Sequence, residues 1–284
     1  MSLISLKEAL DEADKHGYAV GAFNVSNMET VKAVIESAEA ENSPVIIQAT
    51  PGAVQYAGLF LVTSMVKAAV KNTSVPVAFH LDHGTDFELI VRCIVNGFSS
   101  IMFDGSKLPL EENISATARI VEIAKAAGVS TEGELGKIKG TEDEVSVQEG
   151  EDLLTDPEEA RYFLRETEVD ALAVAVGTAH GFYKEEPEID FSRLRAIRDT
   201  CNVPLVMHGA SGVPDEDIVR GIALGIRKIN IDTEIRQAFR KSISRYIEEN
   251  PGNIDPRKMM RPAMEEMKKV IRGKMRLFGS SGKA

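Results

Sequence analysis

Three histidines in this 284-residue chain lie beside glycine where an apolar stretch ends. His83 belongs to P-V-A-F-H-L-D-H-G, His180 to G-T-A-H-G, and His208 to H-G-A-S-G. Three neutral imidazoles with an open position are the ligand set of a catalytic zinc site. No H-E-x-x-H motif is present, so a metalloprotease helix finds no support. The alternative is that each histidine ends its strand independently.

Carboxylates stand at the ends of the same kind of stretch. Asp82 directly precedes His83, Asp104 ends I-M-F-D, and Glu132 and Glu134 lie near the end of another apolar run. An unpaired buried charge is costly, so a core strand has little reason to end in such groups. The other two histidines are not predicted to bind metal. His16 is expected on the surface, and His80 is expected to be a buried structural residue.

The histidines can converge only if their strands end at one edge, and the chain does alternate short apolar runs with amphipathic ones. The predicted strands are 19–25, 44–50, 75–83, 99–104, 129–135, 171–178, 204–208 and 226–232. Their helices are 28–41, 59–71, 87–96, 111–127, a helix from 156–157, 191–200, 215–224 and 234–249. This order predicts one α/β domain over 1–284, a closed (β/α)8 TIM barrel; an open doubly wound sheet is the alternative. Residues 251–284 are predicted to add a C-terminal helix and a polar tail.

Chemistry in such barrels lies at the C-terminal ends of the strands, and His83, His180 and His208 all fall there. The glycines beside the last two histidines, with Ser211 and Thr233 as possible hydroxyl donors, suggest a phosphate-binding loop. The long acidic segment 137–152 is predicted to be a mobile active-site loop. Its alternative is a solvated charged loop.

Composition and net charge limit the kinds of partner and the compartment that we expect for this protein. The net charge of -11 argues against binding to nucleic acid or to an anionic membrane surface. Two cysteines, Cys93 and Cys201, are too few for a disulfide framework and fit a reducing compartment. The N-terminus lacks a signal-peptide pattern, and no apolar run approaches the roughly 20 residues that span a bilayer. We therefore expect a cytoplasmic protein.

Six motifs, in this order, resemble the zinc-dependent class II ketose-bisphosphate aldolases, which include the fructose- and tagatose-1,6-bisphosphate enzymes. They are H-L-D-H-G, I-M-F-D-G-S, E-G-E-L-G, G-T-A-H-G, H-G-A-S-G-V-P and K-I-N-I-D-T-E. The match extends over essentially the whole chain, including D-P-R-K and the terminal G-S-S-G-K-A. One departure is Gly133, where a larger residue is expected.

The resemblance implies a role for each candidate. Zinc is expected on His83, His180 and His208, with Asp104 and Glu134 as alternate or outer metal ligands. Asp82 is expected to be the acid/base at the C4 hydroxyl, and Glu142 in the loop is expected to move the C3 proton. The residues expected to bind the phosphorylated sugar are Asn24, Thr50, Gly181, Gly209, Ala210, Ser211, Asn230, Ile231, Asp232 and Thr233. The resemblance also implies a monovalent cation, Na⁺ or K⁺, and a homodimer or homotetramer.

The sequence favours fructose over tagatose bisphosphate on one residue, because I-N-I-D-T with Asp232 resembles the fructose branch. Three motifs resemble the tagatose branch instead, namely T-P-G-A-V-Q-Y-A-G, L-T-D-P-E-E-A and G-T-A-H-G-F-Y. Three other functions stay open: another related ketose-bisphosphate aldolase, a metal hydrolase or epimerase on the same barrel, and a non-catalytic phosphosugar-binding barrel. The presence of both Asp82 and Glu142 speaks against the last.

Overall fold

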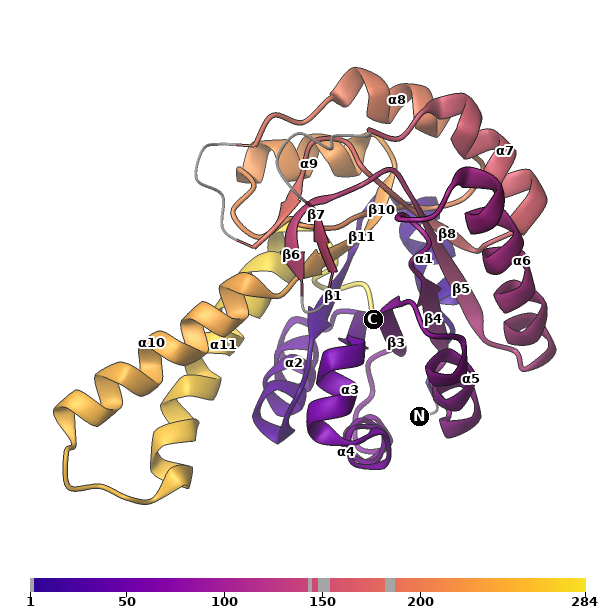
Figure 1. Ribbon diagram of the computed structural model, residues 1–284. Coiled ribbons are helices and arrows are strands. Elements are labelled where there is room, and N and C mark those ends of the chain that lie inside the picture. The colour runs from indigo at the N-terminus through magenta and orange to yellow at the C-terminus, as the bar shows by residue number, and fades with distance from the viewer. Residues whose placement is uncertain (1–2, 143–144, 148–153, 182–186) are drawn as a thin grey trace.

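The computed structural model describes residues 3–142, 145–147, 154–181 and 187–284. In this part of the chain, eight parallel strands close into a barrel in the order β1-β11-β10-β8-β5-β4-β3-β2 (Figure 1). These strands are β1 (Val20–Asn24), β2 (Val45–Ala49), β3 (Val77–Gly84), β4 (Ser100–Phe103), β5 (Ser130–Leu135), β8 (Ala171–Val174), β10 (Leu205–Met207) and β11 (Ile226–Ile231). The prediction of a closed (β/α)8 barrel is confirmed, and the open doubly wound sheet was the wrong alternative.

Helices surround the barrel, and several begin at the capping residues that the sequence offers. The helices are α1 (Leu6–His16), α2 (Met28–Glu41), α3 (Pro51–Ala57), α4 (Leu59–Lys71), α5 (Phe87–Asn96), α6 (Leu110–Ala126), α7 (Pro157–Thr167), α8 (Phe191–Thr200), α9 (Asp215–Ala223), α10 (Thr233–Glu249) and α11 (Pro256–Leu277). Asn27 caps α2, and Asp156 caps α7 with Pro157 as its first residue. Four predicted helices, 28–41, 59–71, 87–96 and 191–200, have the observed bounds. The short α3 was not predicted.

Helix α1 closes the N-terminal end of the barrel. A capping box between Ser5 and Glu8 begins this helix. Its buried residues Leu6, Leu10 and Ala13 pack against the apolar interior side chains of the barrel, namely Val20, Ala22, Ile46, Ala78, Ala171, Ala173 and Val206. Because unpaired charges are costly in such a core, the ionisable residues inside the barrel pair with one another, as Lys228 does with Glu132.

The predicted sixth strand, 171–178, is too long. Strand β8 ends at Val174, and the chain then passes Gly177, whose φ of 109° and close approach to the backbone of Glu188 leave no room for a side chain. Ala179–His180 forms a separate strand, β9, which pairs with β6 (Lys139–Glu142). Strand β6 also pairs with β7 (Val145–Val147), so the predicted loop contains a β-hairpin. Its motion remains a prediction.

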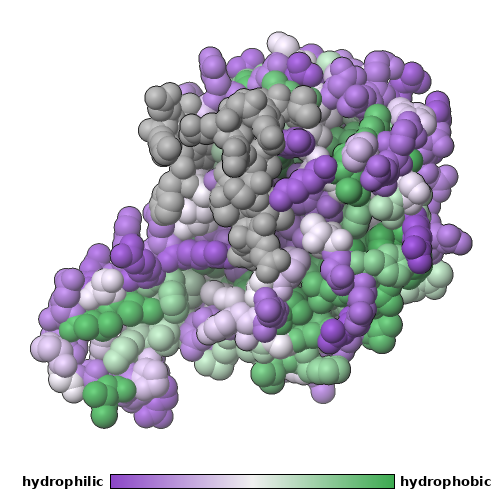
Figure 2. Space-filling view, viewed as in Figure 1, coloured by the Kyte–Doolittle hydropathy of each residue, from purple (hydrophilic) through white to green (hydrophobic). Residues whose placement is uncertain are grey.

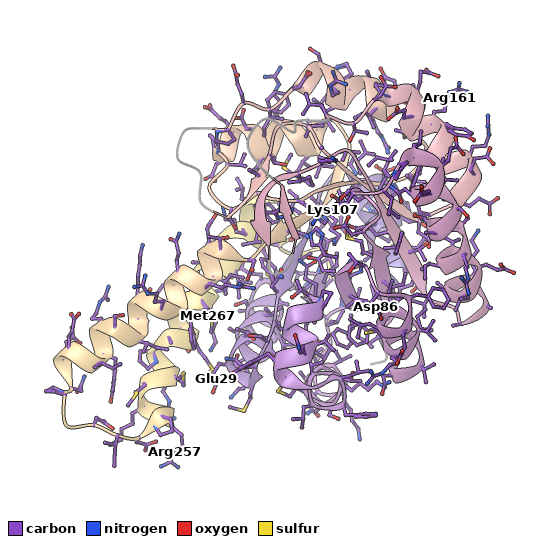
Figure 3. All side chains as sticks on the ribbon, viewed as in Figure 1. Glu29, Asp86, Lys107, Arg161, Arg257 and Met267 are labelled. Atoms are coloured by element: carbon purple, nitrogen blue, oxygen red, sulfur yellow. The ribbon has the colours of Figure 1, made fainter. Side chains whose placement is uncertain are left out.

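Helices α10 and α11 form a hairpin that projects from the barrel (Figure 1). Arg257 lies at the far end of this hairpin, and Met267 lies nearer to the barrel, fully buried (Figure 3). After α11 the chain returns to the end of α2, where Gly282 N donates to Glu41 O at 2.8 Å and Ala284 N to Asn42 O at 2.9 Å. The polar tail is thus hydrogen-bonded to α2.

Hydrophobic side chains gather on the lower part of the visible face, around α3, α4 and α5 (Figure 2). Tyr56, Phe60 and Leu61 are the large exposed ones where α3 meets α4. Among the described residues, no single helix has the length and apolar composition needed to cross a membrane. Helices α3 and α4 meet that test only as a pair, across a bend of 94°.

Candidate metal centre and active site

His83, His180 and His208 converge at the C-terminal end of the barrel, although they are far apart in the sequence. They come from β3, from β9 and from the residue after β10, and all three are buried. The ring centroid of His83 lies 5.1 Å from that of His180 and 4.7 Å from that of His208. One ring nitrogen from each lies within 4.8 Å of the other two. The rim of the barrel therefore holds three imidazoles in one buried group.

His83 reaches this group through an irregularity in β3. Side chains alternate along a strand, so a regular β3 that points Asp82 into the barrel would point His83 outward. The pairing of β3 with β4 shifts register between Leu81 and Gly84, and His83 has a φ of 50°. Few residues other than glycine adopt this left-handed conformation, and a β-bulge is a common way to redirect a side chain. The bulge allows two consecutive residues to face the same site.

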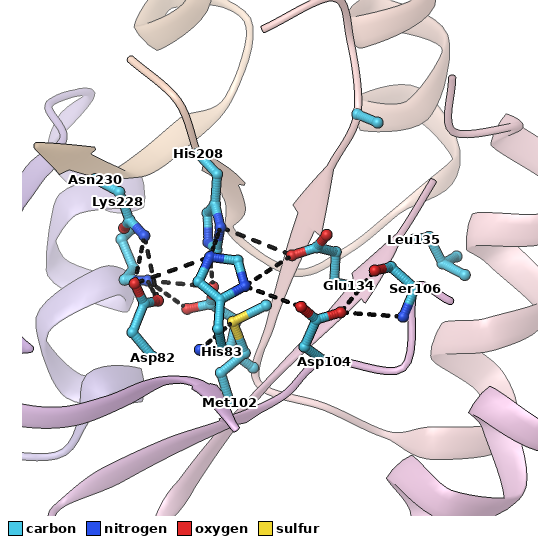
Figure 4. Close-up of polar contacts among 12 residues, drawn as sticks. Asp82, His83, Met102, Asp104, Ser106, Glu134, Leu135, His208, Lys228 and Asn230 are labelled. Atoms are coloured by element: carbon cyan, nitrogen blue, oxygen red, sulfur yellow. Dashed lines mark hydrogen bonds and ion pairs between the residues drawn. The ribbon is translucent and has the colours of Figure 1, made fainter. Parts of the chain in front are cut away.

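The nitrogen atoms of two histidines face each other. His83 Nε2 and His208 Nδ1 are 3.0 Å apart (Figure 4). Two imidazole nitrogens bound to one tetrahedral zinc at about 2.0–2.1 Å would lie about 3.3 Å apart. The opposite ring nitrogens are held by carboxylates: His83 Nδ1 lies 3.0 Å from Asp104 Oδ2, and His208 Nε2 lies 3.0 Å from Glu132 Oε1. Carboxylates in this position orient metal-binding imidazoles, so the donor set fits zinc.

Asp104 and Glu134 lie on one side of the histidines and have opposite pKa shifts. Burial raises the pKa of Asp104, but hydrogen bonds from His83 and Ser106 outweigh burial, so the pKa lies below its ordinary value. Burial and the neighbouring Asp104 raise the pKa of Glu134 well above its ordinary value. His83, Asp104 and Glu134 form a second group with metal-ligand spacing. The predicted alternate metal position therefore has suitable donors, and its use remains a prediction.

Asp82 lies on the other side of the histidines and is completely buried. Gln48 Nε2 donates to Asp82 Oδ2 at 2.8 Å, and Asn230 Nδ2 lies 3.2 Å from both carboxylate oxygens. Gln48 also donates to Asn24 Oδ1 at 2.6 Å. The Asp82 carboxylate lies 4.0 Å from His83 Nε2. Amide donors thus hold a carboxylate in a fixed orientation beside the imidazole group.

The predicted substrate residues after β10 are positioned by a close backbone contact. Gly209 has a φ of 65°, and a Cβ on it would lie 2.6 Å from the carbonyl carbon of Ala179. Only glycine fits here, and the contact joins the residue after His208 to the residue before His180. Gly212 N donates to Glu234 Oε1 at 3.0 Å, which ties this loop to the first turn of α10.

The other predicted substrate residues lie at the ends of neighbouring elements. Thr50 caps α3, and Asp232 precedes α10 and pairs with Arg236. Asn230 faces the interior beside Asp82, whereas Ile231 packs into the core between strands and helices, so only its backbone can serve. Ala210 and Ser211 follow Gly209, Gly181 follows β9, and Thr233 begins α10. Glu142 is the last residue of β6, and its side chain lies outside the described part of the structure.

Sequence reasoning missed Gln48 and Lys228, both of which belong to the site. A polar residue in the middle of a strand run, as in V-I-I-Q-A and I-R-K-I-N-I, was the available signal. Lys228 Nζ lies 2.8 Å from Glu132 Oε2, deep in the barrel. His80 is buried as predicted; burial and the charge of Lys228 lower its pKa to about 3. Gly133 allows close packing, since a Cβ there would lie 2.8 Å from Phe163.

A closed parallel barrel with buried imidazoles and carboxylates at the C-terminal ends of its strands defines a metal-binding enzyme barrel. Comparison with known families matches residues 4–283 to "Fructose-bisphosphate aldolase class-II". The chain belongs to this family and is a class II aldolase, a carbon-carbon lyase. The family depends on zinc and acts on phosphorylated sugars, consistent with the buried histidine group.

Relatives cover the full chain but differ in the activity that their names give. A fructose-bisphosphate aldolase from Geobacillus stearothermophilus is 47% identical, over 100% of this chain and 99% of its own. A sulfofructosephosphate aldolase from Alkalicoccus urumqiensis is 43% identical, with the same coverage. The crystal structure of the YdjI aldolase from Escherichia coli K12 is 35% identical, covers 99% of both chains and has a TM-score of 0.87. The family is therefore clear, while the particular substrate is a separate question.

Proposed function

We propose that this enzyme reversibly cleaves fructose 1,6-bisphosphate into dihydroxyacetone phosphate and glyceraldehyde 3-phosphate, with zinc on His83, His180 and His208. One observation carries the proposal: the amide-bound carboxylate of Asp82 lies 4.0 Å from His83 Nε2, a nitrogen that faces His208. When bound, zinc supplies a Lewis acid for the negative charge that develops on the substrate oxygens. This charge stabilisation requires no Schiff-base lysine.

Asp82 takes the proton of the C4 hydroxyl as the C3–C4 bond breaks, and returns it in the condensation direction. Its buried position excludes water from the carboxylate, and Gln48 and Asn230 hold the orientation that proton transfer needs. Glu142, at the end of β6, moves the C3 proton when its segment covers the substrate. Residues 137–152 then act as the active-site lid.

The phosphate of dihydroxyacetone phosphate binds to the loop after β10 and to the start of α10, from Asn230 to Thr233. Backbone N–H groups at a helix start and beside glycine suit a phosphate. The same phosphate site includes Gly181, Gly209, Ala210 and Ser211. A monovalent cation, Na⁺ or K⁺, binds nearby. Asn24 and Thr50 contact the rest of the sugar. The enzyme acts as a cytoplasmic homodimer or homotetramer.

Two specific observations favour other substrates. Tagatose 1,6-bisphosphate differs only at C4, and three motifs of this chain resemble the tagatose branch. The 43% identical relative is named a sulfofructosephosphate aldolase, which suggests a sulfonate in place of the second phosphate. Asp232, paired with Arg236, lies at the end of β11 and is the residue that favours fructose bisphosphate.

A coupled cleavage assay on all three substrates, with and without a chelator, tests the proposal. We expect the highest kcat/KM on fructose 1,6-bisphosphate, loss of activity with the chelator and recovery with zinc. A higher kcat/KM on tagatose bisphosphate or sulfofructose phosphate would replace the substrate and keep the mechanism. Full activity after verified removal of zinc would contradict the mechanism itself.

A further inference from the structure

Lys228 is a fully buried lysine inside the barrel, with 0% of its surface exposed. Lysine is almost never buried in this way unless its charge is paired. Its Nζ lies 2.8 Å from Glu132 Oε2, 3.2 Å from Glu132 Oε1 and 3.7 Å from Asp82 Oδ1. Lys228 thus places one positive charge between two buried carboxylates, which come from β3 and β5. Figure 4 shows Lys228 beside Asp82.

Each carboxylate contacts a different part of the candidate site. Glu132 Oε1 lies 3.0 Å from His208 Nε2, so the glutamate holds the ring whose other nitrogen faces His83. Asp82 is the proposed acid/base and accepts from Gln48 and Asn230. Lys228 therefore contacts the partner of a proposed metal ligand and the proposed proton-transfer group at the same time.

No other cation lies close to this pair of carboxylates in the described part of the chain. The neighbouring imidazole of His80 lies 3.6 Å from Glu132 and 3.8 Å from Asp82, but its pKa of about 3 leaves it neutral at pH 7. With His80 neutral, the ammonium of Lys228 is the positive charge that lies between the two carboxylates in this dry layer of the barrel. An oxygen of Asp82 and an oxygen of Glu132 lie within 4.8 Å of each other. Without the ammonium, these like charges would repel strongly in a low dielectric and favour other side-chain orientations.

We propose that Lys228 is a positioning residue of the aldol reaction. Its ammonium holds Asp82 in the orientation for proton transfer and holds Glu132 against His208. The contact of Lys228 with Glu132, which in turn contacts His208, concerns metal binding alone, whereas the part that concerns Asp82 rests on the proposed function.

The alternative role for a buried lysine in a lyase is that of a nucleophile that forms a Schiff base with the substrate carbonyl. The position of Lys228 argues against it, because two carboxylates engage Nζ and no part of the side chain is exposed. A nucleophilic amine needs both a free electron pair and access to the substrate. Borohydride reduction in the presence of dihydroxyacetone phosphate is expected to leave the mass of the protein unchanged.

Two variants separate the functions of the ammonium. Lys228→Met keeps an unbranched side chain and removes the charge, and Lys228→Met with Glu132→Gln also removes one negative charge. In the double variant the amide oxygen can still accept from His208. Lys268→Met is the matched control, since Lys268 on α11 is a mostly buried lysine that pairs with Glu36 of α2 and with Glu265 of its own helix.

The measurements are zinc affinity by chelator competition, urea unfolding of the metal-free protein, and kcat and KM. For Lys228→Met we expect zinc affinity about 10-fold to 100-fold weaker, as for loss of other residues that orient metal ligands. We also expect kcat to fall about 100-fold with KM within a few-fold, because proton transfer is commonly worth about 10² to 10⁴ in rate. In the double variant zinc affinity and stability should return while kcat stays low. Lys268→Met should change neither zinc affinity nor kcat.

The outcomes that overturn the proposal differ from those that overturn the proposed function. Unchanged zinc affinity and kcat in Lys228→Met, a recovered kcat in the double variant, or a reduced lysine adduct would each refute the positioning role. If Lys228→Met does not fold, the double variant alone decides, since wild-type kcat in it contradicts the link to Asp82. If the wild-type enzyme cleaves none of the ketose substrates, the proposed function fails, while the zinc and unfolding measurements still test the contact with Glu132.

Discussion

Replacing Gly209 by alanine should separate two of the three histidines without removing any of them. Gly209 follows His208, and Ala179 precedes His180. A Cβ at Gly209 would lie 2.6 Å from the carbonyl carbon of Ala179 and 3.0 Å from its nitrogen. Backbone atoms cannot rotate away as a flexible side chain does, so the two segments must move apart.

The expected loss of stability has two parts. The φ of 65° at Gly209 costs an alanine about 1–2 kcal/mol, as for any L-residue in the left-handed region. The overlap with Ala179 adds about 1–3 kcal/mol, the usual range for overpacking. Gly128→Ala supplies the first part alone, because Gly128 has a φ of 70° and a Cβ there has no neighbour within 4 Å. The difference between the two variants therefore isolates the contact.

Urea unfolding of the metal-free proteins measures this difference, and chelator competition measures zinc affinity. We expect Gly209→Ala to be about 1–3 kcal/mol less stable than Gly128→Ala. We expect its zinc affinity to fall at least about 10-fold, because the imidazoles of His180 and His208 move apart. Equal stability in the two variants, with unchanged zinc affinity in Gly209→Ala, would refute the reasoning.

The remaining predictions concern single side chains. Asp82→Ala should abolish cleavage and retain zinc; loss of zinc would mean that its role is misassigned. His180→Ala should lose both zinc and activity, and normal zinc stoichiometry would remove it from the ligand set. The pKa of His80 is about 3 in the folded protein, below its ordinary value of 6.5. As the pH falls, the unfolded chain therefore takes up the proton first. The contribution of neutral His80 to the free energy of unfolding is thus fully present above pH 6.5. It decreases by about 1.4 kcal/mol for each pH unit as the pH falls from 6.5 toward 3. Unfolding of metal-free His80→Gln should depend less on pH between 6.5 and 5, and an unchanged slope would contradict this. Asp14→Ala should lower the free energy of unfolding by about 1–3 kcal/mol, because it leaves buried Arg227 without the carboxylate 2.7 Å from its Nε. Asp11→Ala breaks an exposed pair and should change the free energy of unfolding by no more than about 0.5 kcal/mol in the same urea assay.

Local patterns predicted most of the elements because their causes are local. Helix 28–41 is bounded by Asn27, which caps it, and by Asn42, which adopts a left-handed conformation. The helix 59–71 was also predicted, but α3 was missed because its seven residues show too few turns for a clear period. The sixth strand was predicted too long, since an apolar run does not show where its backbone leaves the sheet.

The sequence likewise indicated some residues of the candidate site and missed others. Residue types and their places after apolar runs indicated His83, His180 and His208, and the motifs indicated the family. Gln48 and Lys228 were missed because a polar residue inside a strand run does not show which residues of other strands it faces. Their significance depends on Asp82 and Glu132, which are distant in the sequence and adjacent only in the closed barrel.

The sequence by itself determined the alternation of strands and helices, the helix ends, and the residues available for chemistry, because these depend on neighbours a few positions apart. The tertiary structure alone decided which of those residues meet. The register shift in β3 turns His83 inward beside Asp82, the contact of Gly209 with Ala179 brings His180 to His208, and Lys228 joins Asp82 to Glu132. These arrangements follow from strand register and barrel closure, which no local pattern specifies.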